Sequence, residues 1–253
     1  LGFCRDWVIQ IRRMGVILLF SFLVALFLTA VAIPPLMQWA HRINLVDLPA
    51  ARKIHGQPIP LCGGLGVALG ATVPVLMWAP MDPPLKAGLA GAVLMLALGV
   101  IDDARTLHYG WKFVGQAVAV AVAMAGGVVA EHLPLCGLDA APLWLAYGAT
   151  ALFLVAATNA VNLSDGLDGL AGGCVMLTLL AIALLAYPAN GLALMIVAAA
   201  LTGALLGFLR YNTHPAIVFL GDTGSMFLGF LSAVLAILLV QTSHTAVSPA
   251  LPL

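Results

Sequence analysis

Long apolar runs alternate with short polar segments along almost the whole chain. The runs are rich in Leu, Ala, Val and Gly and do not alternate between apolar and polar positions, so they predict helices rather than the strands of a membrane barrel. A bilayer core of about 30 Å requires roughly 20 helical residues. We therefore predict about eight spanning helices, at residues 16–36, 64–80, 86–101, 113–130, 142–159, 172–187, 191–209 and 224–240.

The composition agrees with this pattern. Of the 253 residues, 63% are hydrophobic and only 8% are charged, far from the values of a soluble domain. The predicted fold class is therefore all-α, a polytopic membrane helix bundle that forms a single domain over residues 1–253. The net formal charge is zero and no basic block occurs, so nucleic acid is not an expected partner. The four cysteines lack the paired spacing of a zinc site.

The first residues look unlike the rest of the chain. Met14 stands directly before a strong apolar run, and we interpret residues 1–13 as a non-native upstream extension. The run is long and no small-residue cleavage site follows before Pro34, so we expect a retained span rather than a signal peptide.

The charges of the connecting segments predict their sidedness. When residues before Met14 are set aside, one alternating set of segments holds almost all the basic residues and the opposite set holds only Lys86. The positive-inside rule places the basic set, residues 41–63, 102–112, 160–171 and 210–223, in the cytoplasm. We therefore expect a membrane protein whose polar site faces the cytoplasm.

The first cytoplasmic segment, "VDLPAARKIHGQPIPLCGG", is predicted to be an extended loop because of its prolines and paired glycines. Arg52, Lys53 and His55 are donors that could hold a phosphate group. An ordinary positively charged loop is the alternative.

The second segment, "GVIDDARTLHYGWK", places Asp102 and Asp103 side by side at the end of a span. The two carboxylates repel each other, and the helix dipole disfavours negative charge at this end. Arg105, a divalent metal ion or a proton could compensate them. A turn that caps the next helix is the alternative.

The third segment, "NAVNLSDGLDGLAGG", carries Asn159, Asn162, Asp165 and Asp168 at three-residue spacing. In a helix such neighbours lie close together, and carboxylate and amide oxygens are ligands that suit magnesium. A loop that leads into the next helix is the alternative.

The fourth segment, "FLGDTGSMFLGF", combines Asp222 with Gly221 and Gly224, which allow close approach to a ligand. Thr223 or Ser225 could cap the helix that follows, and its N-terminus would favour an anion such as phosphate. A plain capped turn is the alternative.

Taken together, the four segments suggest phosphoryl transfer at the membrane surface. A metal held by a few carboxylates keeps positions for water or substrate phosphate, and Arg52, Lys53 and His55 would hold phosphate nearby. Such catalysis rests on positioning and on neutralising charge. A soluble nucleotide-linked donor and a lipid acceptor would meet at such a site.

The segments "DLPAARKIHGQPIPLCGG", "GVIDDAR", "TNAVNLSDGLDGLAGG" and "FLGDTGSMFLG" resemble, in order and topology, the cytoplasmic signatures of the polyprenyl-phosphate N-acetylhexosamine-1-phosphate transferases. The resemblance implies transfer of a sugar 1-phosphate from a UDP-N-acetylhexosamine to undecaprenyl phosphate, with release of UMP. It implies magnesium as the cofactor, with manganese as the substitute ion. A homodimer in the lipid bilayer is a further expectation.

The resemblance also implies roles for individual residues. Asn162 and Asp222 would be the metal ligands. Asp102 and Asp103 would form the acidic pair near the lipid phosphate, one of them a candidate base. The remaining implied residues are Asp165 and Asp168 around the nucleotide and pyrophosphate, and Arg52, Lys53, His55 and Asn159 as substrate-binding residues.

The subfamily and the extent of the chain are separate expectations. The form "RKIHGQPIPLCGG" resembles the branch that loads N-acetylglucosamine-1-phosphate for O-antigen, common-antigen or teichoic-acid synthesis, rather than the peptidoglycan branch, which transfers phospho-N-acetylmuramoyl-pentapeptide. Family members continue with further helices and a histidine-rich loop. We therefore expect this chain to be a fragment that is inactive alone.

Two other classes of protein remain as alternatives. An ion-coupled transporter would place its acidic residues near the middle of its spans, often with an inverted repeat. Here the acidic residues gather at one end of the spans. A membrane scaffold would not require that concentration of acidic residues.

Overall fold

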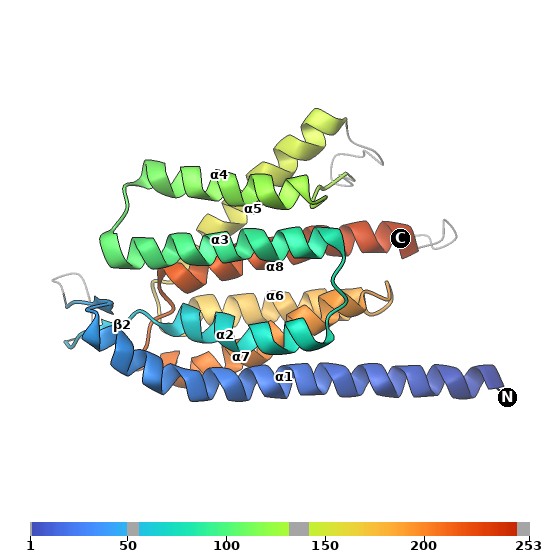
Figure 1. Cartoon of the computed structure of the whole chain (residues 1–253), viewed down its shortest axis with the longest axis horizontal. Coiled ribbons are helices and arrows are strands. Elements are labelled where there is room, and N and C mark those ends of the chain that lie inside the picture. Colours follow the sequence, from blue (N-terminus) through green and yellow to red (C-terminus); the bar gives the residue numbers. More distant parts are fainter. Residues whose placement is uncertain (1, 50–55, 132–141, 247–253) are drawn as a thin grey trace.

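The computed structural model describes residues 2–49, 56–131 and 142–246, and these form eight α-helices and one short antiparallel ladder (Figure 1). The fold class is all-α, as predicted. The ladder pairs β1 with β2 in the register Val46–Pro60 and Asp47–Ile59. The elements are α1 (Gly2–Arg42), β1 (Val46–Asp47), β2 (Ile59–Pro60), α2 (Gly63–Trp78), α3 (Pro83–Arg105), α4 (Tyr109–Ala125), α5 (Leu143–Ser164), α6 (Leu170–Ala186), α7 (Leu192–Asn212) and α8 (Gly221–Ala246).

The helices have the length and composition of a multi-pass membrane protein. Five of them are long and apolar enough to cross a bilayer, namely α1 from Arg12 onward, α3, α5, α7 and α8 up to Thr242. Helices α2, α4 and α6 have 16, 17 and 17 residues. Each predicted apolar run therefore corresponds to one helix.

Several helices extend further than predicted at the polar end of the bundle. Helix α3 continues to Arg105 and stops at Thr106, which has a φ of 45°. Helix α5 continues to Ser164, and α8 already begins at Gly221. Asp102, Asp103, Asn162 and Asp222 therefore lie in terminal helical turns, whose geometry fixes their side chains more firmly than a loop would.

Helix α8 is the most enclosed of the five candidate spans. Of its span, 89% is buried within the protein, against 72% for α7 and 22% for α1 and α5. Helix α8 packs against α3 and α5, while α7 packs against α1, α2 and α6 (Figure 1). At Gly203 of α7 there is no room for a side chain, because the backbone carbonyl of Phe22 on α1 lies against it.

Backbone hydrogen bonds join the segment before α2 to the segment before α8. Phe219 N donates to Pro60 O (2.9 Å), Gly63 N to Phe219 O (3.0 Å) and Gly64 N to Leu220 O (3.0 Å). The first and fourth polar segments therefore meet at one end of the bundle. The predicted phosphate-binding residues Arg52, Lys53 and His55 fall within residues 50–55, outside the described part of the chain.

Candidate active site at one end of the helix bundle

The last turn of α3 lies directly against the first turn of α8. A side chain at Gly99 would collide with the backbone of Asp222 and Thr223, so the two helices touch here through their backbones. One turn further along α3, the carboxylate of Asp103 accepts hydrogen bonds from Asp222 N (2.9 Å), Thr223 N (3.0 Å) and Thr223 Oγ1 (2.6 Å). Asp103 therefore faces the start of α8.

Lys112 at the start of α4 joins two of the carboxylates. Its Nζ forms an ion pair with Asp102 Oδ2 and another with Asp222 Oδ2 (3.1 Å). Asp102 is only 3% exposed, and its Oδ1 accepts a hydrogen bond from Leu107 N (2.7 Å). The cation that compensates Asp102 is thus Lys112, while Arg105 is exposed.

Asn162 brings the end of α5 to the same point. Its Nδ2 donates to Asp222 Oδ1 (2.6 Å) and to Ser225 Oγ (2.9 Å). Asp222 is therefore the centre of the site, because side chains from α4 and α5 both reach its carboxylate and the backbone of α3 and α8 fixes its position.

Asp165 follows α5 directly and carries a strongly shifted pKa. The pKa of its carboxyl group is raised to about 8. Burial is the largest cause, and the negative charges of Asp103 and Asp222 add to it. An interaction with the backbone of Gly221 acts in the opposite direction. Asp165 therefore lies in a partly buried position close to two other acidic groups.

We predict that Asp165 makes the metal-free protein less stable as the pH rises. Its folded-state pKa lies above the usual value near 3.9, so the folded state binds more protons, and the stabilisation is present below pH 4 and lost as the pH rises to about 8. Thermal unfolding in chelating buffer should show a melting temperature that falls from pH 5 to pH 8. In Asp165→Asn this fall should be smaller; an unchanged slope would contradict the assignment.

Asn159 is held away from the carboxylate cluster by a partner on α4. Its Nδ2 donates to Gln116 Oε1 (2.9 Å) and to Val155 O (2.8 Å), and Gln116 Nε2 donates to Asn159 Oδ1 (3.3 Å). Gln116 is only 2% exposed. The two amides therefore connect α4 to α5 one turn from Lys112 and Asn162, and the substrate-binding role of Asn159 stays a prediction.

Asp168 turns toward the segment between α7 and α8. Its Oδ2 lies 2.9 Å from His214 Nδ1 and accepts a hydrogen bond from Ala216 N (3.1 Å). Nearby, Gly169 N donates to Asn212 Oδ1 (2.9 Å). Of the four polar residues at three-residue spacing, Asn162 and Asp165 reach the cluster. The proposed role of Asp168 also stays a prediction.

The structure adds residues that sequence reasoning did not select. Lys112 and Gln116 are not among the candidate residues that the sequence predicts. The signal for both was available, because polar side chains four residues apart in an apolar helix share a face. Thr223 and Ser225, the two residues predicted to cap α8, direct their hydroxyls elsewhere, so this prediction is wrong. Thr223 donates its hydroxyl to Asp103, and Ser225 Oγ donates to Gly221 O (2.9 Å).

The chemistry around Asp222 fits a magnesium ion. Asp222 and Asn162 carry oxygen atoms of the type that magnesium prefers, and a divalent cation would reduce the negative charge of Asp103 and Asp222, which contributes to the raised pKa of Asp165. Within the described ranges, no three His, Cys, Asp or Glu side chains are grouped to hold a metal ion. The proposed ligand set remains Asn162 and Asp222.

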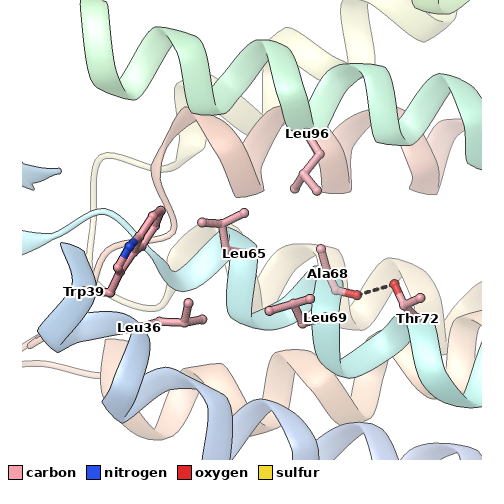
Figure 2. Close-up of a pocket in the computed structure, with 7 residues that line it drawn as sticks. All are labelled: Leu36, Trp39, Leu65, Ala68, Leu69, Thr72 and Leu96. Atoms are coloured by element: carbon pink, nitrogen blue, oxygen red, sulfur yellow. Dashed lines mark hydrogen bonds between the residues drawn. The ribbon is translucent and has the colours of Figure 1, made fainter. Parts of the chain in front are cut away.

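An apolar cavity of about 290 Å³ lies between α1, α2 and α3, apart from the carboxylates (Figure 2). Leu65 and Leu96 face it, and Trp39 lies at one end. Thr72 also lines the cavity, and its hydroxyl donates a hydrogen bond to Ala68 O (2.7 Å). The cavity therefore suits hydrocarbon rather than a nucleotide.

Fold and site together define a multi-pass membrane protein with a partly buried ionic cluster at one end of its helices. The sequence profile of glycosyl transferase family 4 matches residues 85–240, which include α3 to α7 and most of α8. The chain belongs to glycosyl transferase family 4.

Individual relatives agree with this family. The probable undecaprenyl-phosphate N-acetylglucosaminyl 1-phosphate transferase of Bacillus subtilis is 34% identical over 92% of this chain and 66% of its own length. The decaprenyl-phosphate N-acetylglucosaminephosphotransferase of Mycobacterium tuberculosis is 34% identical over 90% and 60%. The phospho-N-acetylmuramoyl-pentapeptide-transferase of Desulforudis audaxviator is 36% identical over 83% and 71%. The chain thus spans less than two thirds of the first two relatives.

Proposed function

We propose that this chain carries the catalytic site of an enzyme that transfers N-acetylglucosamine-1-phosphate from its UDP derivative to undecaprenyl phosphate and releases UMP. The observation that carries the proposal is the convergence of Lys112, Asp102, Asn162 and Asp222 from four helices at one end of the bundle. The names of the relatives, which describe transfer of this sugar phosphate to polyprenyl phosphates, support it.

The distribution of charge supports a cytoplasmic site. When residues before Met14 are set aside, the basic residues concentrate in the connecting segments that also hold the acidic residues of the cluster, and this bias predicts that these segments face the cytoplasm. The named relatives are bacterial proteins, so we infer that the site lies at the cytoplasmic face of a bacterial plasma membrane. UDP-linked donors would reach the site from solution, and the lipid acceptor would reach it from the bilayer. The apolar cavity and the exposed apolar side chains are compatible with a hydrocarbon environment.

The reaction requires a simple exchange at phosphorus. An oxygen of the acceptor phosphate attacks the phosphorus that carries the sugar, and the bond from that phosphorus to the UMP oxygen breaks, with the electron pair leaving on UMP. Magnesium, held by Asn162 and Asp222, would neutralise charge on the phosphates. Lys112 adds positive charge beside Asp222, and Asp102 is the candidate to accept a proton from the acceptor phosphate.

The direct test is the exchange of labelled UMP with the donor. We expect magnesium-dependent exchange in membranes that contain the protein expressed with its native flanking sequence. Asp102→Asn should lower the rate by roughly a hundredfold, because it removes a charge at the site of transfer. Asp82→Asn is the matched control, because Asp82 caps the opposite end of α3 by accepting from Leu85 N (3.0 Å).

The choice of donor separates two functions within the family. Exchange with UDP-N-acetylglucosamine supports the proposal. Exchange only with UDP-N-acetylmuramoyl-pentapeptide would support the function named for the Desulforudis relative instead. An absence of exchange with both donors would contradict the proposal.

A further inference from the structure

The carboxylate of Asp103 is fully committed to the beginning of α8. Its Oδ1 accepts from Asp222 N, and its Oδ2 accepts from both the backbone and the hydroxyl of Thr223. Gly221 lies beneath it with a φ of 72°, and a Cβ on Gly221 would come within 2.7 Å of Asp103 Oδ2. Glycine therefore suits this position for two reasons. It adopts the positive φ readily, and it leaves room for the carboxylate of Asp103.

Helix α8 lacks the usual source of an N-terminal cap. The first N–H groups of a helix have no partner within it and are normally satisfied by a side chain immediately before the helix. Here the residue before α8 is Leu220, which has no polar side chain, and Gly221 has no side chain at all. Thr223 directs its hydroxyl to Asp103, and Ser225 directs its hydroxyl to Gly221 O. The carboxylate that accepts from these N–H groups is that of Asp103 on α3, which lies 119 residues before Asp222 in the chain.

We propose that Asp103 is a positioning residue rather than a catalytic residue: it caps α8 from α3 and thereby fixes where Asp222 stands. The backbone contact at Gly99 holds the two helices together, and the cap one turn later sets the rotation and depth of the first turn of α8. The side chain of Asp222 then reaches Lys112 and Asn162. Asp103 acts on the site through Asp222 and does not touch the reacting atoms.

The two neighbouring aspartates therefore have different duties. Asp102 forms the ion pair with Lys112, whereas Asp103 receives three hydrogen bonds from residues 222 and 223. Adjacent positions on a helix point about 100° apart, so a paired motif can serve two neighbours, α4 on one side and α8 on the other. Repulsion between the carboxylates is reduced because each has its own donors.

Hydrogen exchange at the backbone amides of Asp222 and Thr223 tests the proposal on the chain itself. In Asp103→Ala these two amides should exchange roughly five- to tenfold faster, because they lose their acceptor, while amides in the middle of α7 should keep their rates. Thr223→Val, which removes only the hydroxyl donor, should give a smaller change in the same place. Asp82→Ala removes a cap of the same type at the other end of α3 and should leave residues 222 and 223 unchanged.

A second measurement reports on the position of Asp222 and rests on the proposed function. Binding of Mn²⁺, followed by electron paramagnetic resonance, should weaken by roughly tenfold in Asp103→Ala, less in Asp103→Asn, which keeps one acceptor oxygen, and not in Asp82→Ala. Unchanged exchange at residues 222 and 223 in Asp103→Ala, or a uniform increase over all helices, would overturn the inference. If wild type binds no Mn²⁺ while the local exchange effect is present, the metal assignment fails and the capping role stands.

Discussion

Asp222→Ala is expected to lower UMP exchange by at least roughly a hundredfold and to raise the magnesium concentration that the reaction requires. In the described part of the chain, Asp222 is the one carboxylate that Lys112 and Asn162 both reach. Its loss removes a proposed metal ligand and leaves the Asn162 amide without its carboxylate acceptor. Exchange rates measured over a magnesium titration would separate the effect on affinity from the effect on rate.

Two further variants give this prediction its internal comparison. Asn162→Ala should weaken apparent magnesium affinity in the same direction, because it removes the second proposed ligand. Asp139→Ala should be silent, since residue 139 belongs to the segment predicted to face away from the cytoplasm; it lies outside the described residues. Equal losses in all three variants would show that the sidedness or the site is wrong.

Lys112→Met is expected to give the largest loss of stability, about 3 kcal/mol. Removing the ammonium group leaves Asp102, which is 3% exposed, with a buried charge that has lost its cation. Unfolding in mixed micelles of detergent and SDS would measure the change. Lys86→Met, which removes an exposed lysine near the opposite end of α3, should change stability by less than about 0.5 kcal/mol.

A double variant shows whether this loss comes from the uncompensated charge. Adding Asp102→Asn to Lys112→Met removes the charge that had become unpaired, so the double variant should be more stable than Lys112→Met alone. If the two changes are additive, Lys112 stabilises the fold through its packing or through Asp222, and the Asp102 pair is not the main contribution.

The sequence was sufficient to predict the helices because the signal for a spanning helix is local. Each apolar run is long, and each corresponds to one helix from α1 to α8. The helix ends were less predictable. The predicted spans stop at residues 101 and 159, yet backbone hydrogen bonds extend α3 through Asp102 and Asp103 and α5 through Asn162. Polar residues at a helix end read as a loop unless the partner that satisfies them is known.

The site was predictable as a set but not as a geometry. Asp102, Asp103, Asn162 and Asp222 were named from the sequence, and the structure brings them together. Their partners come from other helices, so no local pattern reveals them. From the sequence, Lys112 contributes only to the charge bias that predicts sidedness. Asn159 shares the spacing of the predicted ligand residues, although it pairs with Gln116. Long-range contacts decide these assignments.

The arrangement also argues against an ion-coupled transporter. A transporter would hold its ionisable residues near the middle of its spans. Here Asp102, Lys112 and Asp222 occupy the end of α3 and the starts of α4 and α8. Membership of glycosyl transferase family 4 is a separate argument against a transporter. The resemblance to polyprenyl-phosphate transferases therefore has support from both the fold and the relatives.

The enclosed position of α8 implies an order of assembly during synthesis. Helix α8 follows the other seven helices in the chain, yet 89% of its span is buried among them. The ion pair between Asp102 and Lys112 requires only α3 and α4. The hydrogen bonds of Asp103 require the amides of Asp222 and Thr223, which are synthesised later. The surfaces of the earlier helices that α8 covers therefore lack this partner until α8 has been synthesised. The ionic cluster is complete only after that, because Asp222 belongs to α8.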